Sequence, residues 1–290
     1  MVEGNSREYG LVLVILSILA SLIICLDLKT IYENRRLKEE LNDNLLFERN
    51  IDTLNEKINE YINIDETIEN KKEEYFNSIR KLEDQILEGK SDAKIAYLTF
   101  DDGPYQLTNQ VLDILKENDV KATFFVLGKD AEDRYKRIVN EGHTLANHTY
   151  YHNIGKGLYR SPESFMSQVN QLEDYLYNIT GYKTNLVRFP GGSETANTFH
   201  VRDSIIEQLH NKGYKYIDWT CETGDGSSKR LQQKSEWEWY KDTCSDQKIM
   251  VLLMHDYHEG TVKILPEIIN DLKSQGYLIL PLSNKSVMVK

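Results

Sequence analysis

Residues 99–104, with the sequence TFDDGP, decide the fold of this chain, and a second run, HTYYH at residues 148–152, completes the argument. The first run follows an apolar stretch at residues 95–98 that is typical of a strand, and it places two adjacent carboxylates at a turn. Neighbouring side chains on an extended chain point to opposite sides, so one acid can bind a metal while the other stays free as a base. One Asp and two His form a three-ligand set that leaves positions open for water, which is typical of a catalytic metal site.

Each of these runs, taken alone, has an ordinary explanation. An Asp-Asp-Gly turn is common because Gly and Pro permit turns, and a lone His-x3-His pattern arises by accident in polar loops. Chance becomes a poor explanation once both runs occur in one chain, followed in a fixed order by the further runs described below.

The composition of the 290 residues bounds the alternatives. The length allows one or two domains plus appendages. The formal net charge of −11, without a basic stripe, argues against a nucleic-acid partner. Of the three cysteines, Cys25 lies in an apolar run, while Cys221 and Cys244 are left to pair or to stay free. Because the sequence has no Cys-x-x-Cys and no Cys-rich zinc pattern, a metal must rest on His and carboxylate side chains.

An uncharged apolar run, LVLVILSILASLIICL, occupies residues 11–26. We predict a short tail at residues 1–10 and an uncleaved transmembrane signal anchor at residues 11–28, in preference to a cleaved signal peptide or a buried helix. The flanking charges conflict with an extracellular domain, because one Arg precedes the run and four basic residues follow it by residue 38. The prediction that the rest of the chain is extracellular therefore depends on the chemistry proposed below.

Residues 29–90 are predicted to form a helical coiled-coil stalk. From about residue 31 to residue 88 the chain has no Pro or Gly and is rich in Glu, Lys and Asn. Apolar side chains recur at alternating three- and four-residue steps, as in a heptad seam: Ile51, Leu54, Ile58, Tyr61, Ile68, Tyr75, Ile79, Leu82 and Ile86. A solvated single helix is the alternative, but the seam favours self-association into a homo-oligomer. Gly89 and the polar residues after it predict the helix end.

Residues 91–290 have the pattern of an α/β domain. Strands are expected at 95–100, 121–127, 143–147, 186–189, 215–220, 249–254 and 277–280, and helices at 108–118, 132–141, 162–180, 202–212, 236–242 and 263–275. This alternation predicts a distorted (β/α)7–8 barrel, in which chemistry collects at the carboxyl ends of the strands. The polar residues at or just beyond these ends are Asp101, Asp102, His148, Arg188, Asp225 and His255.

From about residue 94 to residue 284 the chain resembles the polysaccharide deacetylase domain of carbohydrate esterase family 4, the NodB-homology domain. The two opening runs are highly specific to that family. The resemblance implies that Asp101 is the general base and that Asp102, His148 and His152 bind one divalent metal ion. Zn²⁺ is the expected ion, although this ligand set also accepts Co²⁺, Ni²⁺ or Fe²⁺.

Two later motifs also match the family. Residues 188–192, RFPGG, correspond to the third motif, which implies that Arg188 holds the base and that the backbone N–H of Gly191 binds the oxyanion. The fifth motif implies that His255 is the general acid and that Leu253 lines the acetyl pocket. Arg188 and the metal are expected to lower the pKa of the base.

The fourth motif, CETGDG at residues 221–226, departs from the commonest family form. It keeps Asp225, which is expected to tune His255, but has Gly in place of the Trp that follows. Gly191 also stands where many members carry Tyr. Two aromatic surfaces are therefore expected to be missing, which we interpret as altered specificity rather than lost catalysis.

The remaining histidines and two tryptophans have no assigned role. We interpret His143, His200, His210 and His258 as ordinary surface or loop residues. Trp237 and Trp239 lie in a Glu/Lys-rich helix, where they either pack or border a glycan groove.

The leading hypothesis is a membrane-anchored, metal-dependent N-deacetylase of a cell-envelope polysaccharide, with peptidoglycan as the expected substrate. Chitin oligomers and O-acetylated xylan are the alternatives within the family. A catalytically silent glycan-binding or scaffold protein is the alternative from a different class. If the basic residues that flank the apolar run set the membrane orientation, the domain is cytoplasmic and acts on a small N-acetyl sugar or precursor.

Overall fold

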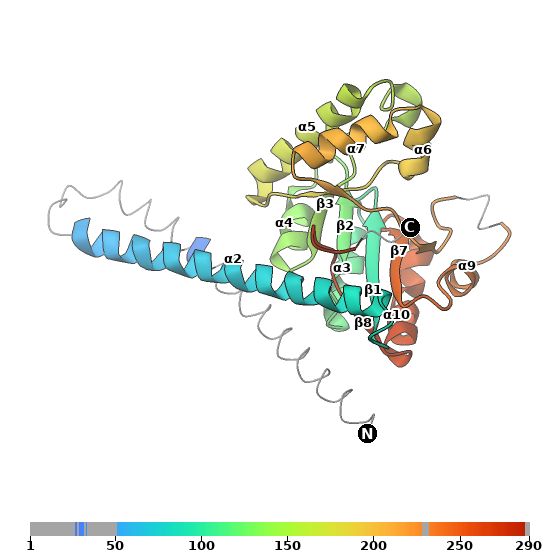
Figure 1. The fold of residues 1–290 in the computed structure, drawn as a ribbon, viewed down its shortest axis with the longest axis horizontal. Coiled ribbons are helices and arrows are strands. Elements are labelled where there is room, and N and C mark those ends of the chain that lie inside the picture. The colour runs from blue at the N-terminus through green and yellow to red at the C-terminus, as the bar shows by residue number, and fades with distance from the viewer. Residues whose placement is uncertain (1–26, 28, 32, 34–50, 228–231, 288–290) are drawn as a thin grey trace. The chain divides into compact units, whose positions relative to one another are not determined.

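The computed structural model describes residues 27, 29–31, 33, 51–227 and 232–287 (Figure 1), and at 51–66, 68 and 69 it describes only the backbone. The chain divides into two compact units, Met1–Ile79 and Arg80–Lys290. All the residues predicted to carry chemistry belong to the second unit.

Much of the predicted amino-terminal architecture lies outside the described residues, including the tail at 1–10 and all of the predicted anchor at 11–28 except Asp27. Of the helices that are described, none combines the length and the apolar character needed to cross a bilayer. Helix α2 (Ile51–Leu87) runs for 37 residues through the predicted stalk and ends before Gly89, which has a φ of 70°. The helix is confirmed over Ile51–Leu87, together with its end, but most of residues 29–50 of the predicted stalk lie outside the described residues. Self-association through the seam stays a prediction.

Eight strands form one sheet in the order β5-β4-β3-β2-β1-β7-β6, with β8 paired to β1 outside this path. They are β1 (Lys94–Asp101), β2 (Thr123–Val126), β3 (Thr144–Asn147), β4 (Leu186–Val187), β5 (Lys215–Tyr216), β6 (Cys221–Glu222), β7 (Ile249–His255) and β8 (Tyr277–Ile279). All the pairings are parallel. Figure 1 shows β3, β2, β1 and β7 side by side in the middle of the domain.

The predicted α/β class and parallel sheet are confirmed, but the barrel does not close. In the described chain β5 and β6 do not pair with each other, so the sheet is a half-barrel. Both strands are two residues long, too short to form the continuous ladder that closure requires.

Six predicted helices are present within a few residues of their expected bounds. They are α3 (Thr108–Glu117), α4 (Glu132–Asn140), α5 (Pro162–Thr180), α7 (Arg202–Asn211), α9 (Glu236–Thr243) and α10 (Glu259–Ser274). Sequence signals explain two of the starts: Ser161 caps α5, and Ser235 forms a capping box with Glu238 at α9. The short elements η1 (Ile154–Lys156), α6 (Ser193–Thr198) and β6 were not predicted, because segments this short show no period.

Strand β1 separates the hydrophobic core from the interior of the half-barrel. Ala96, Leu98 and Phe100 belong to a core cluster that also contains residues of α3 and α10. The residues that alternate with them lie on the other face of the strand. Two of these, Thr99 and Asp101, accept hydrogen bonds from the buried Arg188, which follows β4. The alternation therefore places the predicted base inside the half-barrel, at the carboxyl end of its strand.

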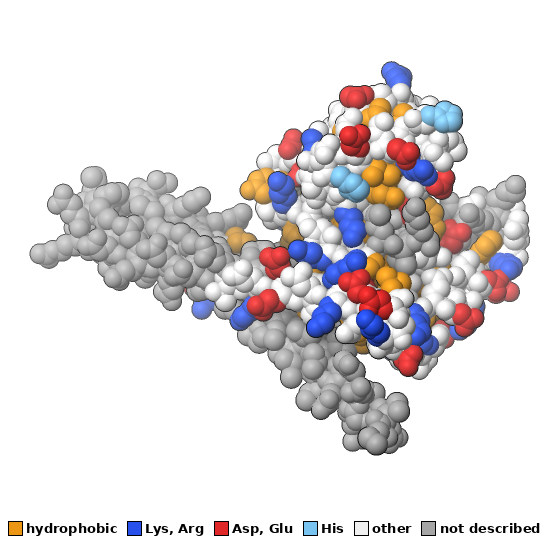
Figure 2. Space-filling model, viewed as in Figure 1, with side chains coloured by type: hydrophobic (Ala, Val, Ile, Leu, Met, Phe, Trp, Pro, Cys, Tyr) orange, Lys and Arg blue, Asp and Glu red, His pale blue; other side chains and the backbone are white. Residues whose placement is uncertain are grey.

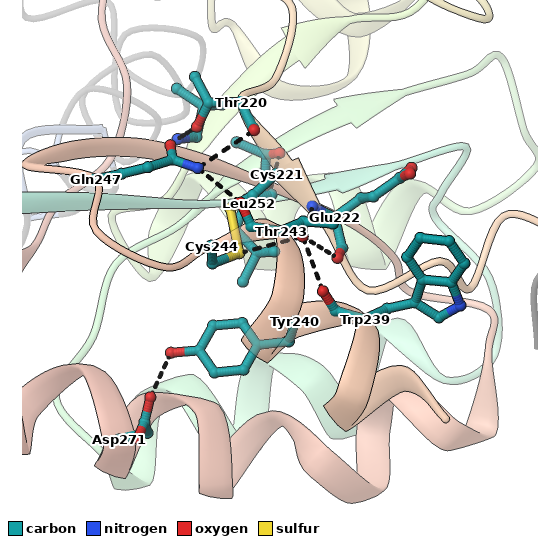
Figure 3. The surroundings of a disulfide bond; sticks show 12 residues. Thr220, Cys221, Glu222, Trp239, Tyr240, Thr243, Cys244, Gln247, Leu252 and Asp271 are labelled. Atoms are coloured by element: carbon teal, nitrogen blue, oxygen red, sulfur yellow. Dashed lines mark hydrogen bonds between the residues drawn. A yellow bond between two sulfur atoms is a disulfide. The ribbon is translucent and has the colours of Figure 1, made fainter. Parts of the chain in front are cut away.

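Cys221 and Cys244 form a disulfide, which settles the alternative left open by the sequence (Figure 3). The bond joins β6 to the residue that follows α9, with a Cα–Cα distance of 5.1 Å. Thr243 adds to the link, because its Oγ1 accepts from the N–H of Glu222 at 3.1 Å and donates to the carbonyl of Glu222 at 2.9 Å. The first residue of the fourth motif is thus covalently linked to the end of helix α9.

His143 lies in the loop directly before β3, as one of the two predicted alternatives has it, but it is not a surface residue. Its side chain is buried, its Nδ1 accepts from the N–H of Ala122 at 3.1 Å, and its ring lies edge-on to Phe124. The position directly before β3 places it against the start of the neighbouring strand. His200 and His210 are exposed, as predicted.

Candidate active site

The proposed base and acid lie next to each other because β1 and β7 are paired in register. Asp101 is the register partner of His255, the last residue of β7. The chain then turns sharply after Asp101, with a φ of 71° at Asp102. Thr149 and His152 also have positive φ, at 67° and 52°. Non-glycine residues with a positive φ are uncommon, and they cluster at functional sites.

The three predicted metal ligands come together at this edge of the sheet. Asp102, His148 and His152 each offer one ligand atom, and these atoms lie within 4.8 Å of one another. Oδ1 of Asp102 is 3.6 Å from Nε2 of His148 and 3.5 Å from Nε2 of His152. Two ligands that are each about 2.1 Å from a tetrahedral ion lie roughly 3.4 Å apart, so the spacing suits one ion.

Two further observations fit a metal at these residues. Oδ1 of Asp102 is buried and has no hydrogen-bond partner among the described residues, which is costly unless a cation occupies the site. Nδ1 of His148 is 2.8 Å from the carbonyl of Arg188, which can only accept, so the lone pair is on Nε2 and faces Asp102. Burial lowers the pKa of His148 to about 3, which keeps the ring neutral as a ligand must be.

The predicted base is held as expected by a buried arginine. Oδ1 of Asp101 accepts from Nη1 of Arg188 at 2.8 Å, and Nη1 also donates to Oγ1 of Thr99 at 2.7 Å. The remaining guanidinium donors bond the carbonyls of Ile217 and Asp218. Each of the three guanidinium nitrogens therefore donates at least one hydrogen bond, and the base has little freedom to rotate.

The protein groups around Asp101 do not by themselves produce the expected lowering of its pKa. Burial raises the pKa of this carboxyl above its usual range, and Arg188 and His255 only partly oppose that effect. A raised pKa suits a general base that must bind a proton during the reaction.

The predicted acid, His255, is oriented and charged by Asp225. Oδ1 of Asp225 is 2.8 Å from Nδ1 of His255, while Oδ2 accepts from the backbone N–H of His255 and from Oγ1 of Thr261. Burial alone would lower the pKa of His255, but the hydrogen bond and charge of Asp225 raise it to about 9. The ring is therefore protonated at neutral pH, and its Nε2 is 3.9 Å from Oδ2 of Asp102.

The other two predicted site residues occupy suitable backbone positions. Gly191 has a φ of 72° in the turn after β4, and no acceptor among the described residues bonds its N–H. Leu253 is buried and lies two residues before His255 on β7, so both side chains point to the same face of the strand. These positions match a donor for the oxyanion and a wall of the acetyl pocket.

The departure in the fourth motif has a physical explanation. A Cβ on Gly226 would lie 2.7 Å from Cε1 of His255, so the backbone itself occupies the space against the ring. The indole of Trp239 lies against Gly224, which has a φ of 70° and no room for a side chain. Trp237 packs on the hydrophobic core beside Tyr240, which answers the question left open for this residue.

The sequence did not indicate several residues that support the site. Thr99 and Thr261 hold Arg188 and Asp225, and their partners are distant along the chain. Asp256, the residue after the acid, is buried and accepts from Oγ1 of Thr108 at 2.5 Å. Such pairings join segments that are distant in the sequence and carry no local signal.

Comparisons with known proteins agree with this geometry. Residues 88–217 match the family described as polysaccharide deacetylase. A peptidoglycan-N-acetylglucosamine deacetylase of Bacillus cereus is 34% identical over 192 residues, which cover 64% of this chain and 68% of that protein. The chain belongs to the polysaccharide deacetylase family. Members of this family are hydrolases that act on N-acetyl amide bonds.

Two other relatives show how much of the chain the family domain covers. YheN of Bacillus subtilis is 40% identical over 194 residues, which cover 63% of this chain and 65% of YheN. The catalytic domain of a peptidoglycan N-acetylglucosamine deacetylase from Eubacterium rectale superposes with a TM-score of 0.62 at 30% identity. That match covers 67% of this chain and 91% of the solved domain. The similarity to this deacetylase therefore spans about two thirds of the chain.

Proposed function

We propose that this polysaccharide deacetylase is a metal-dependent enzyme that removes acetyl groups from the N-acetylated amino sugars of peptidoglycan. The observation that carries the proposal is the juxtaposition of three metal-ligand side chains with a buried base and a charged acid at one edge of the sheet. The names of the relatives from Bacillus cereus and Eubacterium rectale support peptidoglycan as the substrate.

The arrangement supports a hydrolysis in which each residue has one role. A divalent metal held by Asp102, His148 and His152 would polarise the carbonyl and acidify water. Asp101 takes a proton from the attacking water as the oxygen bonds to the carbonyl carbon, and the N–H of Gly191 stabilises the oxyanion. His255 then donates its proton to the amide nitrogen as the C–N bond breaks, which releases acetate and a free amine.

Acetate release from purified peptidoglycan tests the proposal directly. The unsubstituted protein should release acetate, and Asp101→Asn should reduce kcat by about 10²- to 10⁴-fold because the base is lost. If the two proteins release acetate equally, the hypothesis of an N-deacetylase fails and the hypothesis of a catalytically silent glycan-binding protein replaces it.

Removal of the metal is the matching test of the cofactor. Chelation should abolish acetate release, and Zn²⁺ should restore it to the unsubstituted protein. Zn²⁺ should not restore it to His148→Ala, which lacks a ligand. Full activity in the chelated protein would contradict a metal-dependent mechanism.

We also propose that the domain is extracellular and is held to the membrane by residues 11–28. The buried disulfide between Cys221 and Cys244 supports this location, because such bonds persist in oxidising compartments and are rare in the cytoplasm. The charges around the apolar run favour the opposite orientation. Added protease should digest the domain in intact cells, whereas protection until lysis would contradict the proposal.

A further inference from the structure

Two exposed tyrosines border the site next to the proposed acid. Tyr105 lies three residues after Asp102, and Tyr257 lies two residues after His255. Their rings meet edge to face with centroids 5.4 Å apart, and the ring of Tyr257 is 5.3 Å from that of His255. Their exposed fractions are 38% and 37%, so part of each ring is open to solvent. We refer to Tyr105 and Tyr257 as the tyrosine rim.

The backbone beneath the tyrosine rim is fixed by buried contacts. Because Asp101 and His255 are register partners, the loops that follow them emerge side by side. Asp256 accepts from Oγ1 of Thr108 at 2.5 Å, and that oxygen accepts from the N–H of Tyr105 at 2.7 Å. The two loops are thus joined, and the rim does not have to be ordered when a ligand binds.

A lysine completes one side of the rim. Nζ of Lys129 donates to the hydroxyl of Tyr105 at 2.8 Å and lies 4.2 Å from the centre of its ring. The backbone of Lys129 is itself held, because its N–H donates to the hydroxyl of Tyr135 and its carbonyl accepts from that of Tyr175. The lysine and the tyrosine rim therefore form a prearranged surface with both apolar and hydrogen-bonding parts.

This combination suits a pyranose ring. A sugar presents an apolar face of C–H groups edged by hydroxyl groups, and tyrosine offers an aromatic face with a polar end. The positions where many family members carry Tyr and Trp are Gly191 and Gly226 here. The exposed aromatic area beside His255 comes instead from Tyr257 and from Tyr105, which contacts it.

We propose that the tyrosine rim and Lys129 form a binding subsite for the sugar next to the one that loses its acetyl group. This inference rests on the proposed function, since it assigns a substrate contact to the same site. It predicts that the enzyme prefers oligosaccharides to single sugars, and that the preference depends on the two aromatic rings.

The experiment compares tetramers and monomers of N-acetylglucosamine as probes. Tyr105→Ala and Tyr257→Ala should each raise KM for the tetramer about tenfold, with a change in kcat of no more than about threefold. The ratio of kcat/KM between tetramer and monomer should fall by a similar factor. Tyr257→Phe should keep the tetramer preference because it keeps the ring. Tyr177→Ala, which removes an exposed tyrosine of α5, is the matched control and should behave like the unsubstituted protein.

Binding measurements separate this inference from the proposed function. The Asp101→Asn protein should bind the tetramer, and Asp101→Asn/Tyr257→Ala should bind it about tenfold more weakly by calorimetry. Unchanged KM and binding in the alanine variants would overturn the subsite, as would a loss of kcat at constant KM. If the unsubstituted protein releases no acetate but the double variant still loses binding, the proposed function fails and the subsite stands. Absence of both activity and binding would overturn both.

Discussion

The two ends of the half-barrel both bury carboxylates, but they differ in whether the buried oxygens are hydrogen-bonded. At the amino end of β1, Glu83 of α2 is fully buried, and its two oxygens accept from the hydroxyl of Tyr97 at 2.7 Å and the N–H of Val287 at 3.0 Å. At the carboxyl end, Oδ1 of Asp102 and Oδ1 of Asp256 are buried, and no residue in the described part of the chain forms a hydrogen bond with either oxygen.

This difference separates stability from function. A satisfied buried acid joins distant segments, here the end of α2, strand β1 and the carboxyl-terminal segment. An unsatisfied buried carboxylate destabilises the fold unless a metal or a substrate binds it, and Asp102 adds to this cost because its own φ is positive. Substitutions at the amino end should therefore change the free energy of unfolding, and substitutions at the carboxyl end should change the rate and its pH dependence.

Of the substitutions that test this comparison, Asp225→Asn at the carboxyl end is expected to have the largest effect. The substitution removes the negative charge that raises the pKa of His255 to about 9, and burial then lowers that pKa. Asp101 and Asp102 still raise the pKa, but a smaller fraction of the ring is protonated and its orienting carboxylate is lost, so kcat at pH 7.5 should fall by about 10²- to 10³-fold. The alkaline limb of the kcat–pH profile, set near pH 9 by the protonated acid, should move to lower pH. An unmoved limb would show that Asp225 does not tune the acid.

The opposite result is expected for Glu83→Ala at the amino end. The hydroxyl of Tyr97 and the N–H of Val287 would lose their acceptors, which should lower the free energy of unfolding by about 2–3 kcal/mol. The folded fraction should keep its kcat, because neither donor touches the catalytic residues. Urea unfolding measures the loss, with Glu88→Ala as the control, since Glu88 is exposed in the turn after α2. A fall in kcat without a loss of stability would contradict this separation, because it would show that the amino end also contributes to catalysis.

The sequence could predict the carboxyl end far better than the amino end, for a physical reason. The ligands, the base and the acid lie in short runs at strand ends, where local order and the parallel topology bring them together. Glu83 lies inside a heptad pattern, in which an acid beside the apolar seam is expected to face solvent. Its burial depends on Tyr97 and Val287, and no local pattern encodes a partner that is distant in the sequence. The same limit hid the pairing of Asp256 with Thr108 and the burial of His143.

The smallest effect concerns His143, which shows how a misjudged residue near the amino end affects stability. Burial lowers its pKa in the folded chain to about 3, against an ordinary value of 6.5 in the unfolded chain. The unfolded state therefore binds the proton more readily, and the folded state loses stability as the pH falls below 6.5. At pH 5 this single group should cost about 2 kcal/mol relative to pH 8.

Urea unfolding of the unsubstituted protein and of His143→Gln, each at pH 8 and at pH 5, measures this contribution. The stability lost between the two pH values should be about 2 kcal/mol smaller in the variant, whatever the substitution itself costs, because glutamine does not titrate. His210→Gln is the control, since His210 is exposed and its removal should leave the pH dependence unchanged. Equal pH dependence in the two histidine variants would mean that His143 is not buried as a neutral ring, and that acid sensitivity arises at the carboxyl end instead.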